Sequence, residues 1–221
     1  REYAGMGWLA LPMSEGLGGF DGDPNAVAPL MEYVGASLAL EPVLASSVLS
    51  GLLLSHCDGR EAEELARGVA SGAKILAFAH GESAEAKLDA RIEARLDDGR
   101  AVGRKDMVLH GDVADEFLVT LCHSATGKIA LARLDAKDPG VTVNRYRLVD
   151  GRGAATVGMN SARVDVLLDD ADAAVEDVLG QACLALCSEA LGAIKVLNQM
   201  TNEYLKTCLL YTSPSPRDVE E

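Results

Sequence analysis

The sequence predicts an α+β protein in three parts: an N-terminal helical segment, a middle antiparallel β-barrel domain, and the first long helix of a truncated C-terminal helical bundle. Apolar residues recur at helical spacing up to about residue 72, alternate with polar residues through the middle of the chain, and return to helical spacing from Asp172. We therefore place the parts at 1–72, 73–171 and 172–207, followed by a separate tail at 208–221.

Three helices are predicted in the N-terminal part. The first begins at Asp23-Pro24, because aspartate is a good N-cap and proline fits the first turn. Its apolar residues follow at helical spacing and are Val27, Leu30, Met31, Val34 and Leu38. The second helix runs from Pro42 to about Ser55, and the third runs from Glu61 to Ala70, with Gly72 as its stop.

The middle part is predicted to consist of strands. The residues Leu88, Ala90, Ile92, Ala94 and Leu96 alternate with charged residues, as in a half-buried strand, and Asp98-Gly99 follows as a hairpin turn. Further strands are predicted at 101–109, 116–122, 129–134, 141–149 and 162–168, with turns at Thr126-Gly127 and Pro139-Gly140. About six or more strands of this kind predict an antiparallel sheet or barrel.

A helix of about 35 residues is predicted from Asp172 to Thr207, since this stretch contains no proline. Its apolar residues near one face are Val175, Val178, Ala182, Leu186 and Ile194. A helix this long is expected to pack in a bundle. The residues that follow supply no partner helices, so we expect an exposed apolar face, poor stability and no activity from the 221-residue chain alone.

The tail does not continue the helical pattern. Residues 208–218 match one reading frame of a common transposon-end sequencing adapter, and we interpret them as adapter translation rather than as a natural Pro/Ser linker. The first residue is not Met, which indicates a missing start.

Composition narrows the possible partners and location. The chain has 34 acidic and 20 basic residues, a net charge of −14, so nucleic acid and anionic membranes are poor partners. The sequence contains no run of about 18 apolar residues, so we predict no membrane span, and no signal peptide is recognisable. The five cysteines form no Cys-x-x-Cys pair, which favours a reduced, cytoplasmic protein without a metal site.

The residues by themselves do not define an active site. The glycine-rich stretch Glu15–Phe20 is not preceded by an apolar strand, so it is predicted to be a loop rather than a dinucleotide-binding turn. No P-loop, nucleophile elbow or His-Glu-x-x-His motif occurs. His80 and His110 are the histidines of most interest, because both lie near the helix-to-sheet transition.

Several stretches together resemble the acyl-CoA dehydrogenase family. Gly7–Pro12 with Glu15–Gly19 is similar to the N-terminal Gly-x-x-x-x-Pro-Glu-x-x-Gly-Gly signature. Ala77–Glu82 lies where the family has its flavin-contacting Thr-Glu-Pro stretch, and Gly103–Leu109 lies where it has Gly-x-Lys-x-Trp-Ile-Thr. The first long helix of the family's bundle is similar to Glu189–Gly192 and Tyr204–Thr207.

A particular branch of the family is indicated by two further stretches. Val108–Asp115 and Asp150–Ala155 most resemble the pimeloyl-CoA dehydrogenase small subunit.

The resemblance implies α,β-dehydrogenation of an acyl-CoA thioester, with FAD as cofactor and electron-transfer flavoprotein as the soluble electron acceptor. It also implies a homo-oligomer or a hetero-oligomer with another acyl-CoA dehydrogenase subunit. The residues to which it assigns flavin contact are Phe78, His80, Gly81, Glu82, Met107, Val108 and Leu109. The family's catalytic glutamate normally follows the segment that ends at Thr207, so no catalytic residue is named.

The sequence departs from the family where hydroxyl groups would contact the flavin. Gly81 stands for the family's Thr, Ser83 stands for its Pro, and Ala84–Lys87 stand for its Gly-Ala-Gly-Ser loop. Met107–Leu109 replace Trp-Ile-Thr and could be ordinary strand core, leaving backbone N–H groups to bind the flavin. Two alternatives therefore remain open: a non-catalytic scaffold subunit of a heteromeric acyl-CoA dehydrogenase, and a flavin monooxygenase of the same fold.

Overall fold

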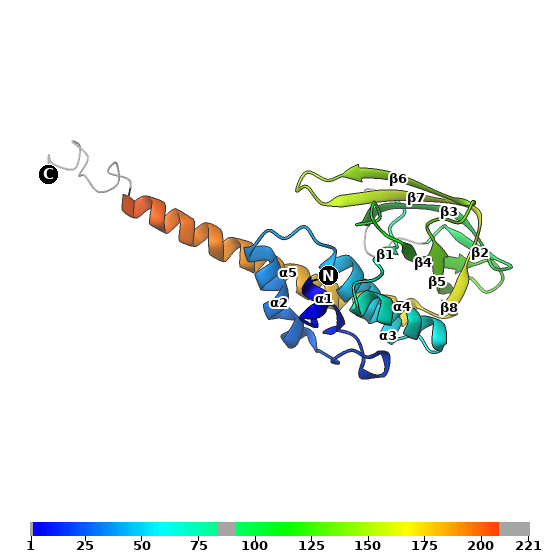
Figure 1. Cartoon of the computed structure of the whole chain (residues 1–221). Helices are drawn as coiled ribbons and strands as arrows, with labels where there is room; N and C mark the ends of the chain where they lie inside the picture. Colours follow the sequence, from blue (N-terminus) through cyan, green and yellow to red (C-terminus); the bar gives the residue numbers. More distant parts are fainter. Residues whose placement is uncertain (1, 84–91, 208–221) are drawn as a thin grey trace.

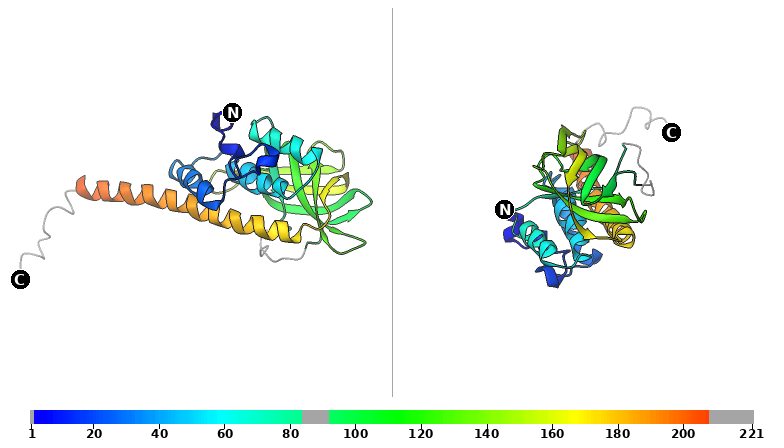
Figure 2. Two further views of the ribbon diagram at one scale, coloured as in Figure 1. Left: turned by 90° about the horizontal axis from the view of Figure 1, so that it is seen from below. Right: turned by 90° about the vertical axis from the view of Figure 1, so that its right-hand side faces the viewer.

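The computed structural model describes residues 2–83 and 92–207. A layer of N-terminal helices lies against one face of a curved sheet, and one long helix, α5, runs past both (Figure 1). Viewed from below, the far end of α5 projects well beyond the rest of the molecule (Figure 2). The predicted tail at 208–221 and residues 84–91 of the predicted loop and first strand lie outside the described residues.

The N-terminal helices are short and broadly follow the predicted positions. Their bounds are α1 Glu2–Gly5, η1 Trp8–Ala10, η2 Glu15–Leu17, α2 Pro24–Ala36, η3 Val43–Ser50, α3 Gly51–Ser55 and α4 Arg60–Ala70. Asp23 caps α2, since its carboxylate accepts the N–H of Ala26 at 2.9 Å. The helix predicted from Pro42 is divided into a π-helical stretch, η3, and an α-helical one, α3.

One predicted core residue of α2 is not buried. Leu38 was expected on the apolar face of the helix, but α2 ends at Ala36, and Leu38 has φ +50° and a 75% exposed side chain. The helical pattern therefore overran the helix by about half a turn. Gly72, predicted as the stop of the third helix, has φ +67°, the left-handed conformation that glycine adopts freely after a helix.

Eight strands form one mixed sheet. Their bounds are β1 Leu76–Ala79, β2 Arg95–Asp97, β3 Arg100–Leu109, β4 Glu116–His123, β5 Ile129–Asp135, β6 Val141–Arg147, β7 Gly153–Arg163 and β8 Asp165–Leu168. The strand order is β6-β7-β3-β2-β4-β5-β8, and β1 pairs with β4. Asp98 and Gly99 form the predicted hairpin turn between β2 and β3, both with positive φ.

The sheet differs from the sequence prediction in strand direction and in two strands that were not predicted. Both β1 and β2 run parallel to β4, so the sheet is not purely antiparallel. The strand order within the described residues ends at β6 and β8, without a pairing that closes it into a barrel. Two strands were missed: β1 is a short run that is buried throughout, and β7 is rich in Gly and Ala, which carry little strand propensity.

The long helix α5, Asp172–Thr207, has the predicted bounds. Val175, Val178 and Ala182 are buried as expected, whereas Leu186 and Ile194 are 41% and 59% exposed. By length and composition α5 could cross a membrane, which is weak evidence because the core helix of a soluble protein passes the same test.

The contact between α2 and α5 depends on two glycines. A Cβ at Gly35 would clash with the carbonyl of Glu189, and a Cβ at Gly192 would clash with the carbonyl of Glu32. The two helices therefore approach closely only because neither glycine has a side chain.

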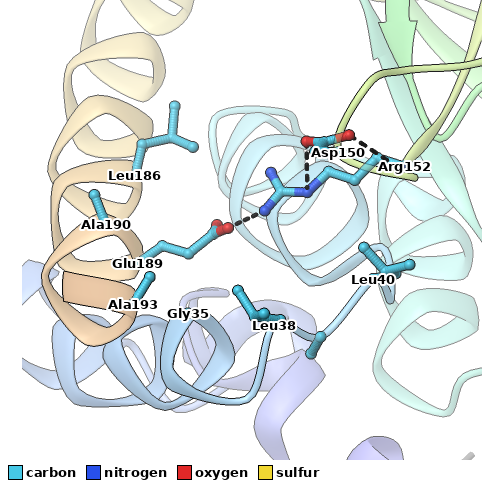
Figure 3. A pocket seen from close by; sticks show the side chains of 10 residues that line it. Gly35, Leu38, Leu40, Asp150, Arg152, Leu186, Glu189, Ala190 and Ala193 are labelled. Atoms are coloured by element: carbon cyan, nitrogen blue, oxygen red, sulfur yellow. Dashed lines mark hydrogen bonds and ion pairs between the residues drawn. The ribbon is translucent and has the colours of Figure 1, made fainter. Parts of the chain in front are cut away.

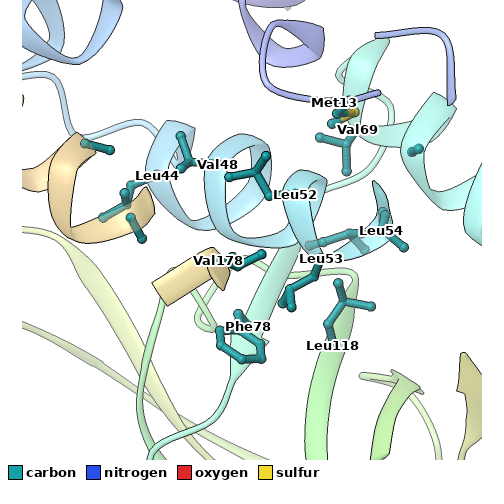
Figure 4. Packing of buried hydrophobic residues seen from close by; sticks show 14 of the residues in the cluster. Met13, Leu44, Val48, Leu52, Leu53, Leu54, Val69, Phe78, Leu118 and Val178 are labelled. Atoms are coloured by element: carbon teal, nitrogen blue, oxygen red, sulfur yellow. The ribbon is translucent and has the colours of Figure 1, made fainter. Parts of the chain in front are cut away.

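Two hydrophobic clusters hold the helices and the sheet together. The first lies between the helical layer and the sheet and includes Leu53, Phe78, Leu118 and Val178 (Figure 4). The second lies on the other face of the sheet and includes the neighbours of Leu118 in β4. Since successive side chains of a strand point to opposite faces, β4 contributes to both clusters and is buried along most of its length.

Candidate functional site

The seven residues assigned to flavin contact lie at the ends of two neighbouring strands. Phe78 belongs to β1, and His80, Gly81 and Glu82 follow directly after it. Met107, Val108 and Leu109 are the last three residues of β3. A hydrogen bond from the N–H of Asp106 to the carbonyl of Gly81, 2.8 Å long, joins the two segments. The structure therefore brings together two stretches that are about 25 residues apart in the sequence. The sequence alone does not show that these stretches are neighbours.

A buried lysine holds this junction. The ammonium group of Lys105 lies 2.6 Å from a carboxylate oxygen of Glu82, 3.0 Å from the carbonyl oxygen of His80 and 3.3 Å from the hydroxyl of Thr120. The lysine side chain is 0% exposed. Burial lowers the pKa of Lys105, and the contact with Glu82 opposes that shift. The three partners come from β4 and from the segment after β1, so one cation fixes both to β3.

Glu82 faces inward as well. Besides Lys105, its carboxylate accepts the backbone N–H of Glu93 at 2.7 Å and that of Ala94 at 2.9 Å. With both oxygens occupied, this side chain shapes the loop, and a flavin would meet the backbone of the segment rather than the carboxylate.

The ring of His80 is stacked on the ring of Phe78, with centroids 5.3 Å apart and planes inclined by 21°. Its Nδ1 lies 3.0 Å from the hydroxyl of Thr120. Burial, with a smaller effect of Lys105, lowers the pKa of His80 to about 4, although Glu82 acts in the opposite sense. His80 is therefore neutral at pH 7, and it lies beside Phe78 as one half of a flat aromatic pair.

The end of β3 contains an irregularity. The pairing of β3 with β7 shifts between Lys105 and Val108, which is the signature of a β-bulge. Met107 within it has φ +50° and a 47% exposed side chain. Asp106 is held by the hydroxyl of Thr156 at 2.8 Å, and the N–H of Met107 donates to the hydroxyl of Tyr146 at 3.2 Å.

Val108 and Leu109 supply core side chains. Val108 is 1% exposed and belongs to the cluster on the far face of the sheet, while Leu109 packs against the cluster beneath the helices. The interpretation of these two as strand core therefore describes their side chains. Flavin contact at Val108 and Leu109 stays a prediction for their backbone groups only.

A second concave region lies between the end of α2, the turn after β6 and the middle of α5. This groove has a volume of about 480 Å³ and is mostly apolar, and its lining includes Leu38, Leu40, Leu186, Ala190 and Ala193. Arg152 lies at its polar end, paired with Glu189 and 3.5 Å from a carboxylate oxygen of Asp150 (Figure 3).

Sequence reasoning missed the Arg152–Glu189 pair. The two residues are 37 positions apart, in two stretches that the sequence gives no reason to pair, so only the packing of α5 reveals their contact. His110, one of the histidines singled out in the sequence, lies in a small cavity beside the pair, together with Leu109 and Glu41. Burial lowers the pKa of His110, an effect that Asp112 opposes.

The described part of the chain shows no candidate metal-binding site. Residues 2–83 and 92–207 contain no group of three or more His, Cys, Asp or Glu side chains that could hold a metal ion. Four cysteines, Cys57, Cys122, Cys183 and Cys187, are free thiols.

No family model and no curated protein sequence matches this chain. Solved structures match it well. A variant of the steroid acyl-CoA dehydrogenase Tcur3481–Tcur3483 is 26% identical with a TM-score of 0.81, and the ChsE4–ChsE5 complex from Mycobacterium tuberculosis is 26% identical with a TM-score of 0.82. Each match covers 94% of this chain and 57% of the other. An acyl-CoA dehydrogenase from Geobacillus kaustophilus, 21% identical, matches with a TM-score of 0.79 over 100% of this chain and 62% of its own.

The fold of this chain is therefore that of the acyl-CoA dehydrogenases. The chain spans less than two thirds of the length of these structures. Two similar structures contain a flavin, namely a glutaryl-CoA dehydrogenase from Mycobacterium smegmatis with FADH2 and PigA with FAD and proline, at 20% and 19% identity.

The two strand ends fit a flavin in part. A flavin ring is planar and carries hydrogen-bonding groups along its edge, so it needs flat apolar contacts beside polar donors. The half-exposed Met107 and the flat Phe78–His80 pair supply apolar surface. One polar group next to them is the backbone N–H of Met107, which already donates a hydrogen bond to the hydroxyl of Tyr146.

Proposed function

We propose that this chain is part of an FAD-dependent acyl-CoA dehydrogenase of the pimeloyl-CoA dehydrogenase small-subunit type. The observation that carries the proposal is the 26% identity to two acyl-CoA dehydrogenase structures over 94% of the chain, at TM-scores of 0.81 and 0.82. The local geometry supports it, since the residues that the sequence assigns to flavin contact converge at the ends of β1 and β3.

In this proposal the chain binds the FAD and orients its ring. Lys105 fixes the segment after β1 to β3, and the neutral His80 with Phe78 gives that segment a flat surface. The segments 78–82 and 107–109 would hold the FAD, which would supply the hydride-accepting chemistry for the β-carbon of an acyl-CoA. Removal of the α-proton needs a carboxylate in a dry pocket, and we assign this role to no residue of the chain.

The partners proposed are an acyl-CoA substrate, electron-transfer flavoprotein as electron acceptor and another acyl-CoA dehydrogenase subunit, in the cytoplasm. Two of the similar structures are named as pairs of gene products, Tcur3481–Tcur3483 and ChsE4–ChsE5, which supports a heteromeric assembly. The strongly acidic surface, with a net charge of −14, supports the absence of nucleic acid among the partners.

The test is anaerobic addition of acyl-CoA thioesters to the complete protein purified with its partner subunit. The proposal predicts that at least one thioester bleaches the visible absorbance of the flavin. Failure to retain FAD, or a flavin that no thioester reduces while dithionite does, would count against it.

A non-catalytic scaffold subunit is the second candidate. It is favoured by the partnered N–H of Met107 and by the inward-facing side chains of Glu82 and Val108, which leave few polar side-chain groups for a flavin. The same experiment distinguishes the two candidates when each subunit is purified alone. A scaffold leaves FAD and thioester reduction entirely with its partner, whereas a catalytic subunit retains FAD itself.

A further inference from the structure

A strained bulge in β3 lies where flavin contact is proposed. Asp106 and Met107 fall within the register shift between β3 and β7. Met107 has φ +50°, a conformation that is unusual for a residue with a side chain and that persists only where the surroundings hold it. Bulges of this kind occur next to active sites, where they redirect a side chain or a backbone group. The bulge is therefore a position whose conformation depends on the contacts that hold it.

Besides the ion pair of Asp106 with Arg104 of the same strand, three hydrogen bonds to other segments hold the bulge. The N–H of Asp106 donates to the carbonyl of Gly81 at 2.8 Å, and the carboxylate of Asp106 accepts the hydroxyl hydrogen of Thr156 at 2.8 Å. The third contact is the hydrogen bond from the N–H of Met107 to the hydroxyl oxygen of Tyr146, 3.2 Å long. Only this third contact reaches the half-exposed part of the bulge, since the Met107 side chain is 47% exposed.

Tyr146 reaches the bulge from two strands away. It lies on β6 opposite Ala154 of β7, and Ala154 in turn lies opposite Leu109 of β3. The residue between is an alanine, whose methyl group leaves room for a tyrosine ring to cross β7. A phenol oxygen that accepts one hydrogen bond still has its own proton to donate. Among the hydrogen bonds of residues 2–83 and 92–207, none uses that proton.

We propose that Tyr146 is a flavin-contacting residue, whose hydroxyl accepts the N–H of Met107 and donates its proton to an acceptor atom on the edge of the bound flavin. This inference rests on the proposed function. The triplet Met107–Leu109 contains no hydroxyl, and Tyr146 supplies one from β6 at the same position. The same contact fixes the orientation of the hydroxyl, since its oxygen is held by the backbone of β3.

The test compares Tyr146→Phe with Tyr33→Phe in the complete protein. Tyr33 lies on α2, is 62% exposed and contacts Trp8 edge-on, so its substitution removes a phenol hydroxyl away from the bulge. The affinity for FAD is measured by quenching of flavin fluorescence, the flavin absorption spectrum is recorded, and the free energy of unfolding is measured by urea titration. We expect Tyr146→Phe to weaken FAD binding by about 3- to 10-fold and to shift the visible flavin bands. Tyr33→Phe should do neither.

The spectrum separates contact from a purely structural role. If Tyr146 only braces the bulge, Tyr146→Phe lowers the stability and leaves the flavin bands of the loaded protein unchanged, which contradicts the inference. Equal FAD affinity of the wild type and Tyr146→Phe contradicts it too, while leaving the proposed function intact. Failure of all three proteins to bind FAD contradicts the proposed function and the inference together.

Discussion

Lys105 has the most demanding environment of any residue at the proposed flavin site. An ammonium group without solvent exposure is stable only when its hydrogen bonds are satisfied, and here a carboxylate, a carbonyl and a hydroxyl surround it. Each of these partners belongs to a segment that the site requires: Glu82 and His80 follow β1, and Thr120 lies on β4. Lys105 on β3 therefore holds β4 and the segment after β1 in place, and with them the surface where flavin contact is proposed.

Lys105→Met tests this link. The substitution removes the cation and leaves Glu82 largely buried with only its two backbone N–H partners, so we expect a loss of about 3 kcal/mol in the free energy of unfolding, measured by urea titration. The control is Lys128→Met, which removes a lysine from an exposed pair with Asp170 and should leave the stability unchanged. Equal stability of Lys105→Met and the wild type would show that the cation is dispensable.

His80 makes stability depend on pH. Its pKa is about 4 in the folded chain and about 6.5 when unfolded, so the unfolded chain binds the proton more tightly. The contribution of the neutral ring is fully present above pH 6.5 and is lost as the pH falls toward 4. We expect His80→Gln to flatten the decline in the free energy of unfolding between pH 6.5 and pH 4.5, by an amount on the order of 2 kcal/mol. A pKa near 6.5 for the assigned ring resonance of His80 in the folded protein would contradict this.

At the scale of elements, the crossing of α2 and α5 depends on Gly35 and Gly192. Gly35→Ala would place a methyl group against the carbonyl of Glu189, so we expect it to lower the free energy of unfolding by about 2 kcal/mol or more. Gly180→Ala is a matched control, because Gly180 lies on α5 with open space around its Cα. That control should raise the stability by about 0.5–1 kcal/mol through helix propensity. Equal effects of the two changes in a thermal melt would show that the helices do not pack as described.

The elements differ in how well the sequence predicts them. Asp23-Pro24 and the period of α5 are local signals that one stretch of chain settles, and both helices begin where predicted. β1 and β7 depend on neighbours instead: β1 is a buried strand that pairs with β4 and packs against η3, and β7 is a Gly- and Ala-rich strand that lies between β3 and β6. Their own residues carry little strand preference, so the sequence did not reveal them.

The candidate site shows the same division. The residues 77–82 and 105–109 could be assigned from their likeness to family motifs. The hydrogen bonds of Thr120 and Tyr146 to β3 come from β4 and β6, strands that do not pair with β3 themselves. Contacts of this kind have no sequence motif, because the residues meet only after the strands pair.

At the scale of the whole molecule, α5 exposes a large apolar surface beyond its contact with α2. Its exposed side chains include Leu191, Ile194, Leu197, Met200 and Tyr204, each at least 46% exposed. Exposed apolar surface of this extent favours association with a partner. It agrees with the sequence prediction of a helix that needs bundle partners.

The 221-residue chain is therefore expected to self-associate. Sedimentation velocity should show oligomers or aggregates, and Leu197→Lys combined with Met200→Lys should shift the population toward monomer. Gln199→Lys adds one charge to the same helix without removing an apolar side chain and serves as the control. A monodisperse monomer of the unsubstituted chain, with a sharp thermal transition, would contradict this expectation.

A flavin site at the ends of β1 and β3 can be tested by amide hydrogen exchange of the complete protein with and without FAD. We expect slower exchange on FAD binding in peptides that cover 77–82 and 105–109, and unchanged exchange in β5. If FAD binds and instead slows exchange only around Arg152 and Glu189, or leaves both strand ends unchanged, the site has been placed wrongly.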